Sequence, residues 1–477
     1  MDFNLLDTAD YVLAQKLFLK VVGLSYFLAF WSLFKQVLGL YGSKGIIPIQ
    51  ESLKVIKENK TIHPYVRVPT LFWFDASDRS LRKLAGFGMA ASCMVMLGIV
   101  PALFLFLLWV SYLSFVTVGM EFLSFQWDVL LLEVGFVSFF FALQSPPPFF
   151  LLMALWFLLF RFMFASGAVK LLSGCPSWRS CTAMNVHYET QPLPNRIAYF
   201  VHHQPEWLAK ASVFVMFFVE MVIPFLIFGT DGMRNVAFWI LFGLQVVICL
   251  TGNYGFFNIL TAALCFSLLP NSSLTWLMSI PAYEEPHHMI HLILEGVGVA
   301  LVALNILEFI AIFGRPRWIL QLLSKISPYY IVNSYGLFAW MTTTRDEIIV
   351  DGSVDGETWK TYEFQWKPGD LFTVPKQVAP YHPRLDWQMW FASLGSYRSN
   401  YWFIDFLIRL LEGSPDVLRL LKKNPFPQRP PKYIRSLLYQ YHFSDLETLR
   451  KTGQWWTRTY KGYYTPPFTL QKTDDVK

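Results

Sequence analysis

The chain has 477 residues, of which 54% are hydrophobic, 18% aromatic and only 15% charged. Soluble domains carry roughly 25% charged residues, so this composition indicates an integral membrane protein and excludes a purely soluble one. Residues 1–314 hold 17 Lys and Arg against 18 Asp and Glu, whereas residues 315–477 hold 22 against 15. We predict a near-neutral transmembrane domain over 1–314 and a soluble domain over 315–477, whose small positive surplus does not indicate a nucleic-acid partner.

The transmembrane domain is predicted to be a multi-pass helical bundle, because a span takes about 20 mostly apolar helical residues. The apolar stretches lack the period-two alternation that is typical of barrel strands. The candidate spans are residues 17–41, 86–118, 127–143, 148–172, 208–228, 234–269 and 288–313.

Two of these stretches are too long for one upright span. Residues 86–118 contain no polar turn, so we predict one long, tilted or kinked helix there. Residues 234–269 contain TGNYGFFN, whose glycines and asparagines predict a break between two short helices. The expected number of spans is therefore about seven to nine.

Loop charges predict an orientation, since cytoplasmic loops carry an excess of Lys and Arg. Residues 43–83 carry eight of them, Lys60 included, and are placed in the cytoplasm. Residues 173–207 carry two, and three predicted spans separate the loops, so this second loop is placed on the opposite side. Counting onward puts the carboxy-terminal domain on that same non-cytoplasmic side, or in the cytoplasm if residues 234–269 cross only once.

The carboxy-terminal domain is predicted to be β-rich with a helical insert. Short apolar and aromatic strings separated by Gly, Asp and Pro are typical of strands and turns. The strand-like strings are EIIVDGS, WKTYEFQW, DLFTVPK, RLDWQMWF, YIRSLLYQYHF and GQWWTRTYKGYYTPP. The predicted helical insert is YWFIDFLIRLLEGSPDVLRLLKK.

Four ionisable side chains inside predicted spans are functional candidates, because charges are costly in a membrane: Glu133, Arg161, Lys170 and Glu220. One interpretation is that they pair between helices, with Lys170 and Asp128 reaching toward the membrane interface. The alternative is a polar cavity in which Arg161 faces an anionic group, with Glu133 or Glu220 as its partner.

The polar string HYETQPLP supplies His187, Tyr188, Glu189, Thr190 and Gln191 as a candidate functional loop. It offers a base and several hydrogen-bond donors, but no Gly-rich phosphate loop, nucleophile elbow or metal motif accompanies it. Three roles stay open: capping the bundle, binding a partner or substrate, and catalysis. No catalytic residue and no cofactor are assigned.

Two further patterns concern metals and disulfides. His287 and His291 have the i, i+4 spacing of helical ligands, but no carboxylate or cysteine stands at a metal spacing beside them, so no metal site is predicted. Cys175 and Cys181 share the loop SGCPSWRSCTAM. They form a possible disulfide if the loop faces an oxidising compartment, and two free thiols otherwise.

Eight strings together carry a resemblance to a known family. In the membrane part they are QWDVLLLEVGF, FRFMFASGAVKLLSG, HYETQPLP and GNYGFFN, and in the tail SYGLFAWMTTTRDEI, DGETWKTYEFQWKPGD, PYHPRLDWQMWFASL and WWTRTYKGYYTPP. From about residue 64 to 467 the chain resembles the lipase maturation factor family. The resemblance implies a multi-pass protein of the endoplasmic reticulum membrane that helps secreted lipases fold and assemble. It implies no catalytic residue, and a bacterial source would place the protein in the inner membrane.

The resemblance also implies that the carboxy-terminal domain lies in the lumen and contacts client proteins. Aromatic side chains with Arg are the usual anchors of interfaces. The candidate client-binding residues are Arg384, Asp386, Trp387, Trp390, Trp455 and Trp456. The alternative for most of these rings is the core of the domain itself, and the oligomeric state of the chain stays open.

A second resemblance suggests an enzyme. The segment FASGAVKLLSG, followed by Trp178, resembles part of the membrane domain of vitamin K-dependent gamma-carboxylases. Such an enzyme would need a basic group inside the bundle, and Lys170 and His187 are the nearby candidates.

Overall fold

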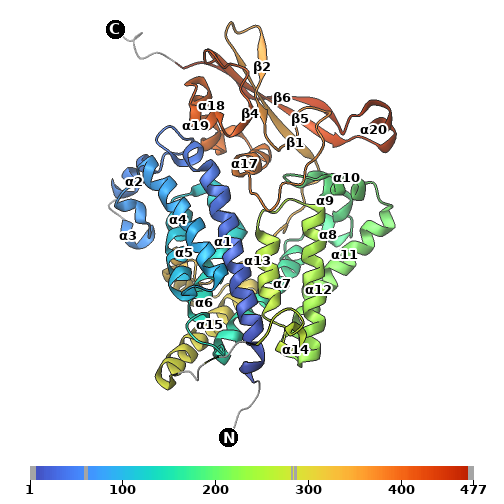
Figure 1. Ribbon diagram of the computed structural model, residues 1–477. Helices are drawn as coiled ribbons and strands as arrows, with labels where there is room; N and C mark the ends of the chain where they lie inside the picture. Colours follow the sequence, from blue (N-terminus) through green and yellow to red (C-terminus); the bar gives the residue numbers. More distant parts are fainter. Residues whose placement is uncertain (1–6, 59–62, 281–282, 284–286, 471–477) are drawn as a thin grey trace.

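The computed structural model describes residues 7–58, 63–280, 283 and 287–470. Helices lie together in the lower part of the molecule, and a domain with strands lies above them (Figure 1). We call the helices up to residue 314 the helical bundle and residues 345–468 the tail domain. The long helices of the bundle are α1 (Val12–Tyr41), α4 (Asp78–Leu97), α5 (Pro101–Val116), α6 (Gln126–Phe141), α7 (Phe149–Leu172), α11 (Glu206–Met221), α12 (Asp231–Thr251), α13 (Phe257–Phe266) and α15 (His288–Gly314).

Shorter helices connect the long ones. They are η1 (Thr8–Tyr11), α2 (Ile49–Glu58), α3 (Pro64–Arg67), η2 (Leu71–Trp73), η3 (Met120–Leu123), α8 (Pro176–Arg179), α9 (Ala183–Thr190), α10 (Arg196–His202), η4 (Ile223–Phe228) and α14 (Asn271–Leu274). Between bundle and tail domain stand α16 (Arg317–Ile326) and η5 (Ser327–Tyr329).

Five helical segments are long and apolar enough to cross a membrane: Thr8–Tyr41, Phe149–Leu172, Glu206–Phe228, Asp231–Thr251 and His288–Gly314. Two shorter apolar helices are Pro101–Val116 and Phe257–Phe266. The helical, multi-pass character of this region is therefore confirmed. The predicted count of seven to nine spans is not established by these lengths.

Residues 86–118 form a helical hairpin, so the prediction of one long helix is wrong. Helix α4 ends at Gly98, which has a left-handed φ of 77°, and Ile99 N donates to Met94 O at 2.9 Å. Pro101 then begins α5, and Thr70, just before α4, donates to Ser114 O near the end of α5 at 2.9 Å. The two helices are thus antiparallel. The turn escaped prediction because it contains no polar side chain.

The hairpin changes which loops share a face of the membrane. Arg409 Nε of the tail domain donates to Gly45 O at 2.8 Å, and Ser414 Oγ donates to Lys44 O at 2.7 Å. The start of the basic loop 43–83 and the tail domain therefore lie on one side, whereas the main charge count predicted opposite sides and its alternative predicted the same side. Because residues 86–118 were counted as one span although they form two helices, the predicted number of membrane crossings before the tail domain was too small by one. Lys60 lies outside the described residues.

The tail domain is built on a four-stranded antiparallel sheet in the order β2-β1-β5-β6, with a small β3-β4 pair beside it. The strands are β1 (Arg345–Ser353), β2 (Trp359–Thr361), β3 (Glu363–Phe364), β4 (Leu421–Lys423), β5 (Tyr433–Phe443) and β6 (Trp456–Phe468). The helices are α17 (Arg384–Ser393), η6 (Tyr397–Ser399), α18 (Tyr401–Leu411), α19 (Pro415–Leu418) and α20 (Leu446–Thr452). Helix α17 lies between the sheet and the bundle (Figure 1).

The prediction of a domain with strands and a helical insert is confirmed, with three exceptions. The last residues of the predicted helical insert, Leu421–Lys423, form strand β4. DLFTVPK forms no strand, and RLDWQMWF forms α17. Nearly every side chain of α17 is buried, so it lacks the polar face that reveals a helix, while its Leu, Met, Gln and Ala favour helix over strand.

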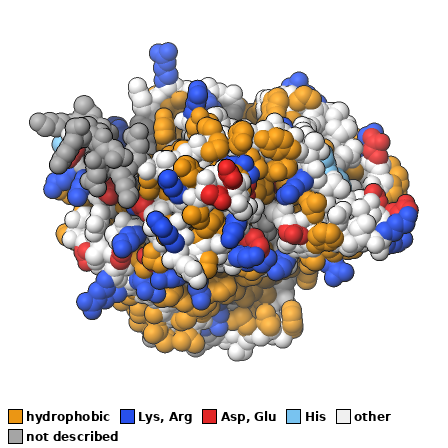
Figure 2. All heavy atoms as spheres, turned by 90° about the horizontal axis from the view of Figure 1, so that it is seen from above, with side chains coloured by type: hydrophobic (Ala, Val, Ile, Leu, Met, Phe, Trp, Pro, Cys, Tyr) orange, Lys and Arg blue, Asp and Glu red, His pale blue; other side chains and the backbone are white. Residues whose placement is uncertain are grey.

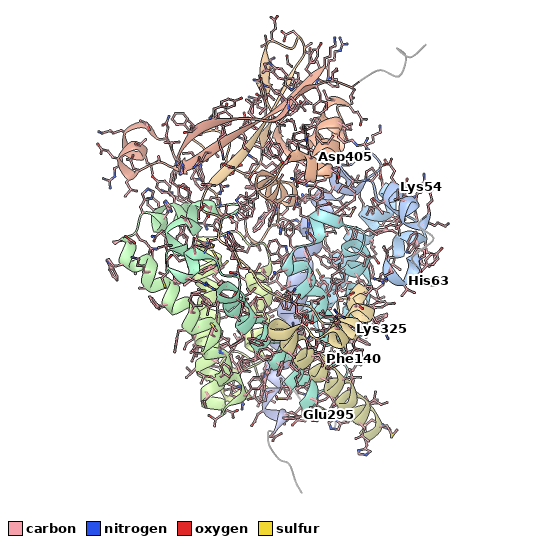
Figure 3. The ribbon with its side chains drawn as sticks, turned by 180° about the vertical axis from the view of Figure 1, so that it is seen from behind. Lys54, His63, Phe140, Glu295, Lys325 and Asp405 are labelled. Carbon is pink, nitrogen blue, oxygen red and sulfur yellow. The ribbon has the colours of Figure 1, made fainter. Side chains whose placement is uncertain are left out.

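The segment between bundle and tail domain packs against the helices. Figure 3 shows Lys325 of α16 at about the height of Phe140 of α6. Further along, Asn333 N donates to Glu133 in α6 at 2.9 Å, and Gly336 N donates to Gln126 at 3.2 Å. The division at residue 314/315 stays a prediction, and the strands begin only at β1.

Candidate functional site

The string HYETQPLP joins the bundle to the tail domain. His187 to Thr190 end α9, so the predicted loop is partly helical, and residues 191–194 follow without helix. Arg345, fully buried at the start of β1, donates to the carbonyl oxygens of Glu189 at 2.8 Å, Gln191 at 2.5 Å and Pro192 at 2.9 Å. One guanidinium from the sheet thus binds three carbonyl groups within four residues of this segment.

The side chains of Glu189 and Gln191 point to different partners. Glu189 accepts from the backbone N–H of Phe443 in β5 at 2.8 Å and lies 3.0 Å from His442 Nδ1. Gln191 accepts from the Tyr254 hydroxyl at 3.1 Å and donates to Thr251 O at 2.9 Å. Glu189 therefore holds the tail domain, while Gln191 holds the break between α12 and α13.

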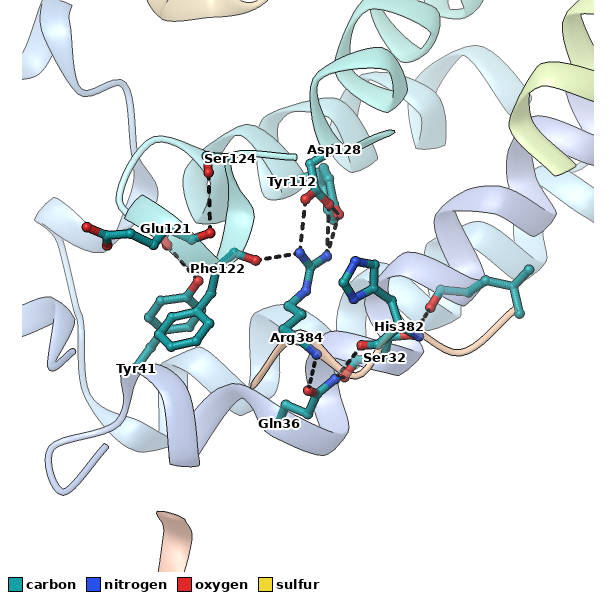
Figure 4. Close-up of polar contacts among 12 residues, drawn as sticks. Ser32, Gln36, Tyr41, Tyr112, Glu121, Phe122, Ser124, Asp128, His382 and Arg384 are labelled. Carbon is teal, nitrogen blue, oxygen red and sulfur yellow. Dashed lines mark hydrogen bonds and ion pairs between the residues drawn. The ribbon is translucent and has the colours of Figure 1, made fainter. Parts of the chain in front are cut away.

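A second joint is formed by Arg384 of α17, which enters the bundle (Figure 4). Its Nη1 and Nη2 donate to the two carboxylate oxygens of Asp128 at 2.9 and 2.8 Å, and the Tyr112 hydroxyl also donates to Asp128. Nη1 donates further to Phe122 O at 2.6 Å. Asp128 is fully buried, so the prediction that it reaches the membrane interface is wrong. The reason is that the tail domain supplies its counter-charge.

The third cluster lies inside the bundle. Arg161 forms a salt bridge with Glu133, and Glu133 also accepts from Tyr335 at 2.7 Å and from Asn333 N at 2.9 Å. Arg161 Nε donates to Asn305 at 3.0 Å. Glu133 is thus the partner of Arg161, and the linking segment after α16 completes the cluster.

Lys170 and Glu220 form a separate buried pair between α7 and α11. Lys170 Nζ donates to the two carboxylate oxygens of Glu220 at 2.7 and 2.5 Å. Both side chains are buried, so the prediction that Lys170 reaches the interface is wrong. A buried charge needs a paired, hydrogen-bonded partner, and Glu220 provides it.

All six candidate client-binding residues are buried, so none forms an exposed surface. Arg384 binds Asp128, and Asp386 accepts from Trp366 N and Lys367 N at 2.8 and 2.9 Å. Burial raises the pKa of Asp386 to about 6, although these donors and the Lys367 charge act to lower it. The rings of Trp387, Trp390, Trp455 and Trp456 pack in the domain and at its joint, because a domain this aromatic fills its own core with them.

A cavity of about 430 Å³ opens beside this joint, between α17, the start of α6 and residues 336–342. We call it the junction cavity. Its walls include Trp127, Pro192, Tyr254, Trp340 and Trp387. Five of the eight strings quoted above contribute to it: QWDVLLLEVGF, HYETQPLP, GNYGFFN, SYGLFAWMTTTRDEI and PYHPRLDWQMWFASL. Segments far apart in sequence therefore meet at one hollow.

The junction cavity has an exposed rim and unpaired polar groups in its walls. Trp340 is 63% exposed, Leu394 49% and Phe391 39%. Among the described residues, the indole N–H groups of Trp127 and Trp387 are buried without a hydrogen-bond partner. Sequence reasoning missed Trp340, because only the fold brings it beside α17, and it also missed Leu394, which directly follows α17 in the chain.

Two family models match the chain: the lipase maturation factor transmembrane domain over residues 13–276 and the lipase maturation factor C-terminal domain over residues 331–466. The human protein named lipase maturation factor 2 is 33% identical over 96% of this chain and 83% of its own length. Mouse lipase maturation factor 1 is 32% identical over 98% of this chain and 89% of its own length.

The chain belongs to the lipase maturation factor family. A further relative, lipase maturation factor 2 of Gallus gallus, is 32% identical over 96% of this chain and 81% of its own length. No solved structure matches the chain significantly. The junction cavity takes its walls from both matched regions of the family. Each of these relatives is named a maturation factor, and none is named an enzyme.

The cysteines and histidines of this family member complete the candidate residues. Cys175 and Cys181 are both free, and Cys175 Sγ accepts from Met341 N at 3.4 Å. Within the described ranges, no group of three or more His, Cys, Asp or Glu side chains could hold a metal ion. His291 instead lies 3.1 Å from Gln144 Nε2.

Proposed function

We propose that this chain is a membrane-bound maturation factor that assists the folding and assembly of secreted lipases. The observation that carries the proposal is the junction cavity, whose walls come from five strings characteristic of the family. The names of the relatives support lipases as the clients and a non-enzymatic role.

The client segment that fits the junction cavity is an extended, apolar stretch of an incompletely folded lipase. Aromatic walls and an exposed rim of Trp340, Phe391 and Leu394 offer the kind of anchor that interfaces use. The outer face of the tail domain, seen in Figure 2, is different, because Lys and Arg are scattered across it between apolar patches.

The test compares two pairs of exposed aromatic residues. Cells that lack their own maturation factors and secrete a lipase are supplied with the chain, with Trp340→Ala/Phe391→Ala, or with the control Tyr401→Ala/Tyr460→Ala. The control rings are 78% and 52% exposed and do not line the cavity. We expect the chain and the control to raise lipase activity per unit lipase mass, and the cavity variant to lose most of that gain.

Two results would contradict this proposal at different levels. Full activity of the cavity variant at equal expression would exclude the junction cavity as the client site. No gain from the intact chain, well expressed and inserted, would exclude lipase maturation itself.

The proposal includes an orientation: seven to nine spans in the endoplasmic reticulum membrane, with the tail domain in the lumen, where secreted lipases fold. The five long apolar helices and the two shorter ones support this count. Loop 43–83 is rich in Lys and Arg, and its start contacts the tail domain, which favours the opposite orientation.

A new glycosylation site decides between the two orientations. Gly356 lies in an exposed turn with a left-handed φ of 85°, which asparagine tolerates, and Thr358 completes the sequon. We expect Gly356→Asn to add a glycan that a glycosidase removes. An inserted, unglycosylated variant would place the tail domain in the cytoplasm.

A further inference from the structure

A second cavity, of about 560 Å³, lies within the bundle between α7, α9, α11 and α12. We call it the lateral cavity. Most of its lining is apolar, including Phe162, Met216, Leu244 and Ile248. A wall containing Tyr254 and residues 337–338 separates it from the junction cavity, since these residues line both. Its volume lies in the usual range of ligand sites, roughly 300–1,000 Å³.

The lateral cavity reaches the outer surface of two membrane-spanning helices. Its lining includes Leu208 and Val215 of α11, which are 39% and 60% exposed, and Trp239 and Val247 of α12, which are 66% and 54% exposed. Both helices are long and apolar enough to cross a membrane. In a bilayer these side chains face acyl chains, so the molecules that can reach the cavity from this edge are lipids.

The inner end of the lateral cavity is polar but carries no net charge. Lys170 and Glu220 neutralise each other through two hydrogen bonds. Burial, together with the nearby Lys170 charge, lowers the pKa of His187 to about 4, so its ring is neutral at pH 7. Among the described residues that line the cavity, a phosphate or a carboxylate would find no free cation, and its desolvation would be uncompensated.

Unused hydrogen-bonding groups remain at this inner end. Among the described residues, the Tyr188 hydroxyl has no hydrogen-bond partner, although the side chain is only 8% exposed. Gln245 accepts from Asn258 at 3.0 Å, and its own Nε2 donates to no described residue. These groups suit the hydroxyl and ester oxygens of an uncharged head group.

We propose that the lateral cavity binds an uncharged glycerolipid of the diacylglycerol class, which enters between α11 and α12. Its acyl chain lies along the apolar lining, and its hydroxyl and ester oxygens bind Tyr188 and Gln245. This site is separate from the junction cavity and does not depend on the identity of the client.

Glycine 243 allows the cavity to be filled without disturbing the fold. Gly243 lines the cavity in α12, and a Cβ atom added there would meet nothing within 4 Å. Gly296 in α15 also has open space around it but does not line the cavity. Leucine favours helix over glycine at both sites. Gly243→Leu is therefore the test variant and Gly296→Leu its matched control.

The experiment uses the full-length protein in bilayer nanodiscs with a diacylglycerol that carries a photoreactive group on one acyl chain. We expect cross-links on α11 and α12, at least about ten-fold fewer in Gly243→Leu, and unchanged labelling in Gly296→Leu. Tyr188→Phe removes one neutral hydrogen bond, which corresponds to about five-fold weaker retention. Unlabelled diacylglycerol should compete, whereas phosphatidic acid and oleate should not.

Three results would overturn the proposal. Equal labelling of the two glycine variants would mean that the probe does not enter the lateral cavity. Equal competition by phosphatidic acid or oleate would exclude an uncharged head group as the determinant. Unchanged retention of the diacylglycerol by Tyr188→Phe would mean that the polar end of the cavity does not bind the head group.

Discussion

The joint between bundle and tail domain and the outer edge of the bundle are built in opposite ways. At the joint, Arg345 and Arg384 bury their guanidinium groups against carbonyl groups and Asp128, and the two terminal nitrogens of each guanidinium are hydrogen-bonded. At the edge, α11 and α12 leave a hollow with apolar walls. Directional charged contacts fix one geometry, whereas a loosely filled apolar space admits a mobile occupant. The comparison indicates that the joint holds the tail domain rigidly. It also indicates that bound molecules exchange with the surrounding membrane at the outer edge of the bundle.

The largest expected effect comes from breaking the buried pair of the joint. Arg384→Met leaves Asp128 buried and unpaired, which costs about 3–5 kcal/mol of the free energy of unfolding. Limited proteolysis at the tail domain and thermal unfolding in detergent should both show the loss. The double variant Arg384→Met/Asp128→Leu should recover most of the stability, because no charge is then left alone. A single variant as stable as the parent would mean that the joint does not hold the tail domain.

A smaller effect is a dependence on pH within the tail domain. Burial raises the pKa of Asp386 from 3.8 to about 6. The folded state therefore binds a proton more tightly than the unfolded chain, and the free energy of unfolding falls as pH rises from about 4 to 6. A shift of roughly two units corresponds to about 3 kcal/mol at most. In Asp386→Asn, the free energy of unfolding should depend less on pH between about 4 and 6 than in the parent protein. Identical slopes in the two proteins would refute the raised pKa of Asp386.

The smallest of the three effects concerns the hydrogen bonds between HYETQPLP and the sheet. Glu189→Ala leaves Phe443 N–H without its acceptor, which costs about 1–3 kcal/mol. The exposed carboxylate of Glu206 pairs with Lys210 on the same helix, so Glu206→Ala should change stability by less than about 0.5 kcal/mol. Thermal unfolding compares the two. For the double variant Glu189→Ala/Gln191→Ala, we expect weaker client maturation but normal membrane insertion.

Much of the architecture follows from sequence patterns, and the failures have specific physical causes. The strands β1, β5 and β6 were predictable because their aromatic and β-branched strings end at Gly, Pro or Asp. The hairpin at Gly98 was not, since its turn relies on backbone conformation and has no polar side chain. Helix α17 was mistaken for a strand because burial on nearly all sides hides its periodicity.

The candidate site shows the same limit. Sequence alone indicates that Asp128, Glu133, Arg161 and Lys170 are costly in a membrane and need partners. It does not indicate which partners, because Arg384 is 256 positions away from Asp128 and sequence spacing carries no signal over that distance. The aromatic residues considered as client-binding candidates are buried, in line with the alternative that such rings form the core of the domain, and the exposed rim of the junction cavity was overlooked.

The insertion of Arg384 into the bundle has a consequence for biosynthesis. The helices leave the ribosome first, and until the tail domain follows, Asp128 and the acceptors around it have no cation. A chain cut short after residue 314 therefore keeps the Asp128 carboxylate without its cation, and Glu133, although paired with Arg161, lacks the hydrogen bonds from Asn333 and Tyr335. The helical bundle thus reaches its fully paired state only after the tail domain has been synthesised and folded. An unfinished chain exposes an unpaired carboxylate within its helices, which cellular quality control can recognise.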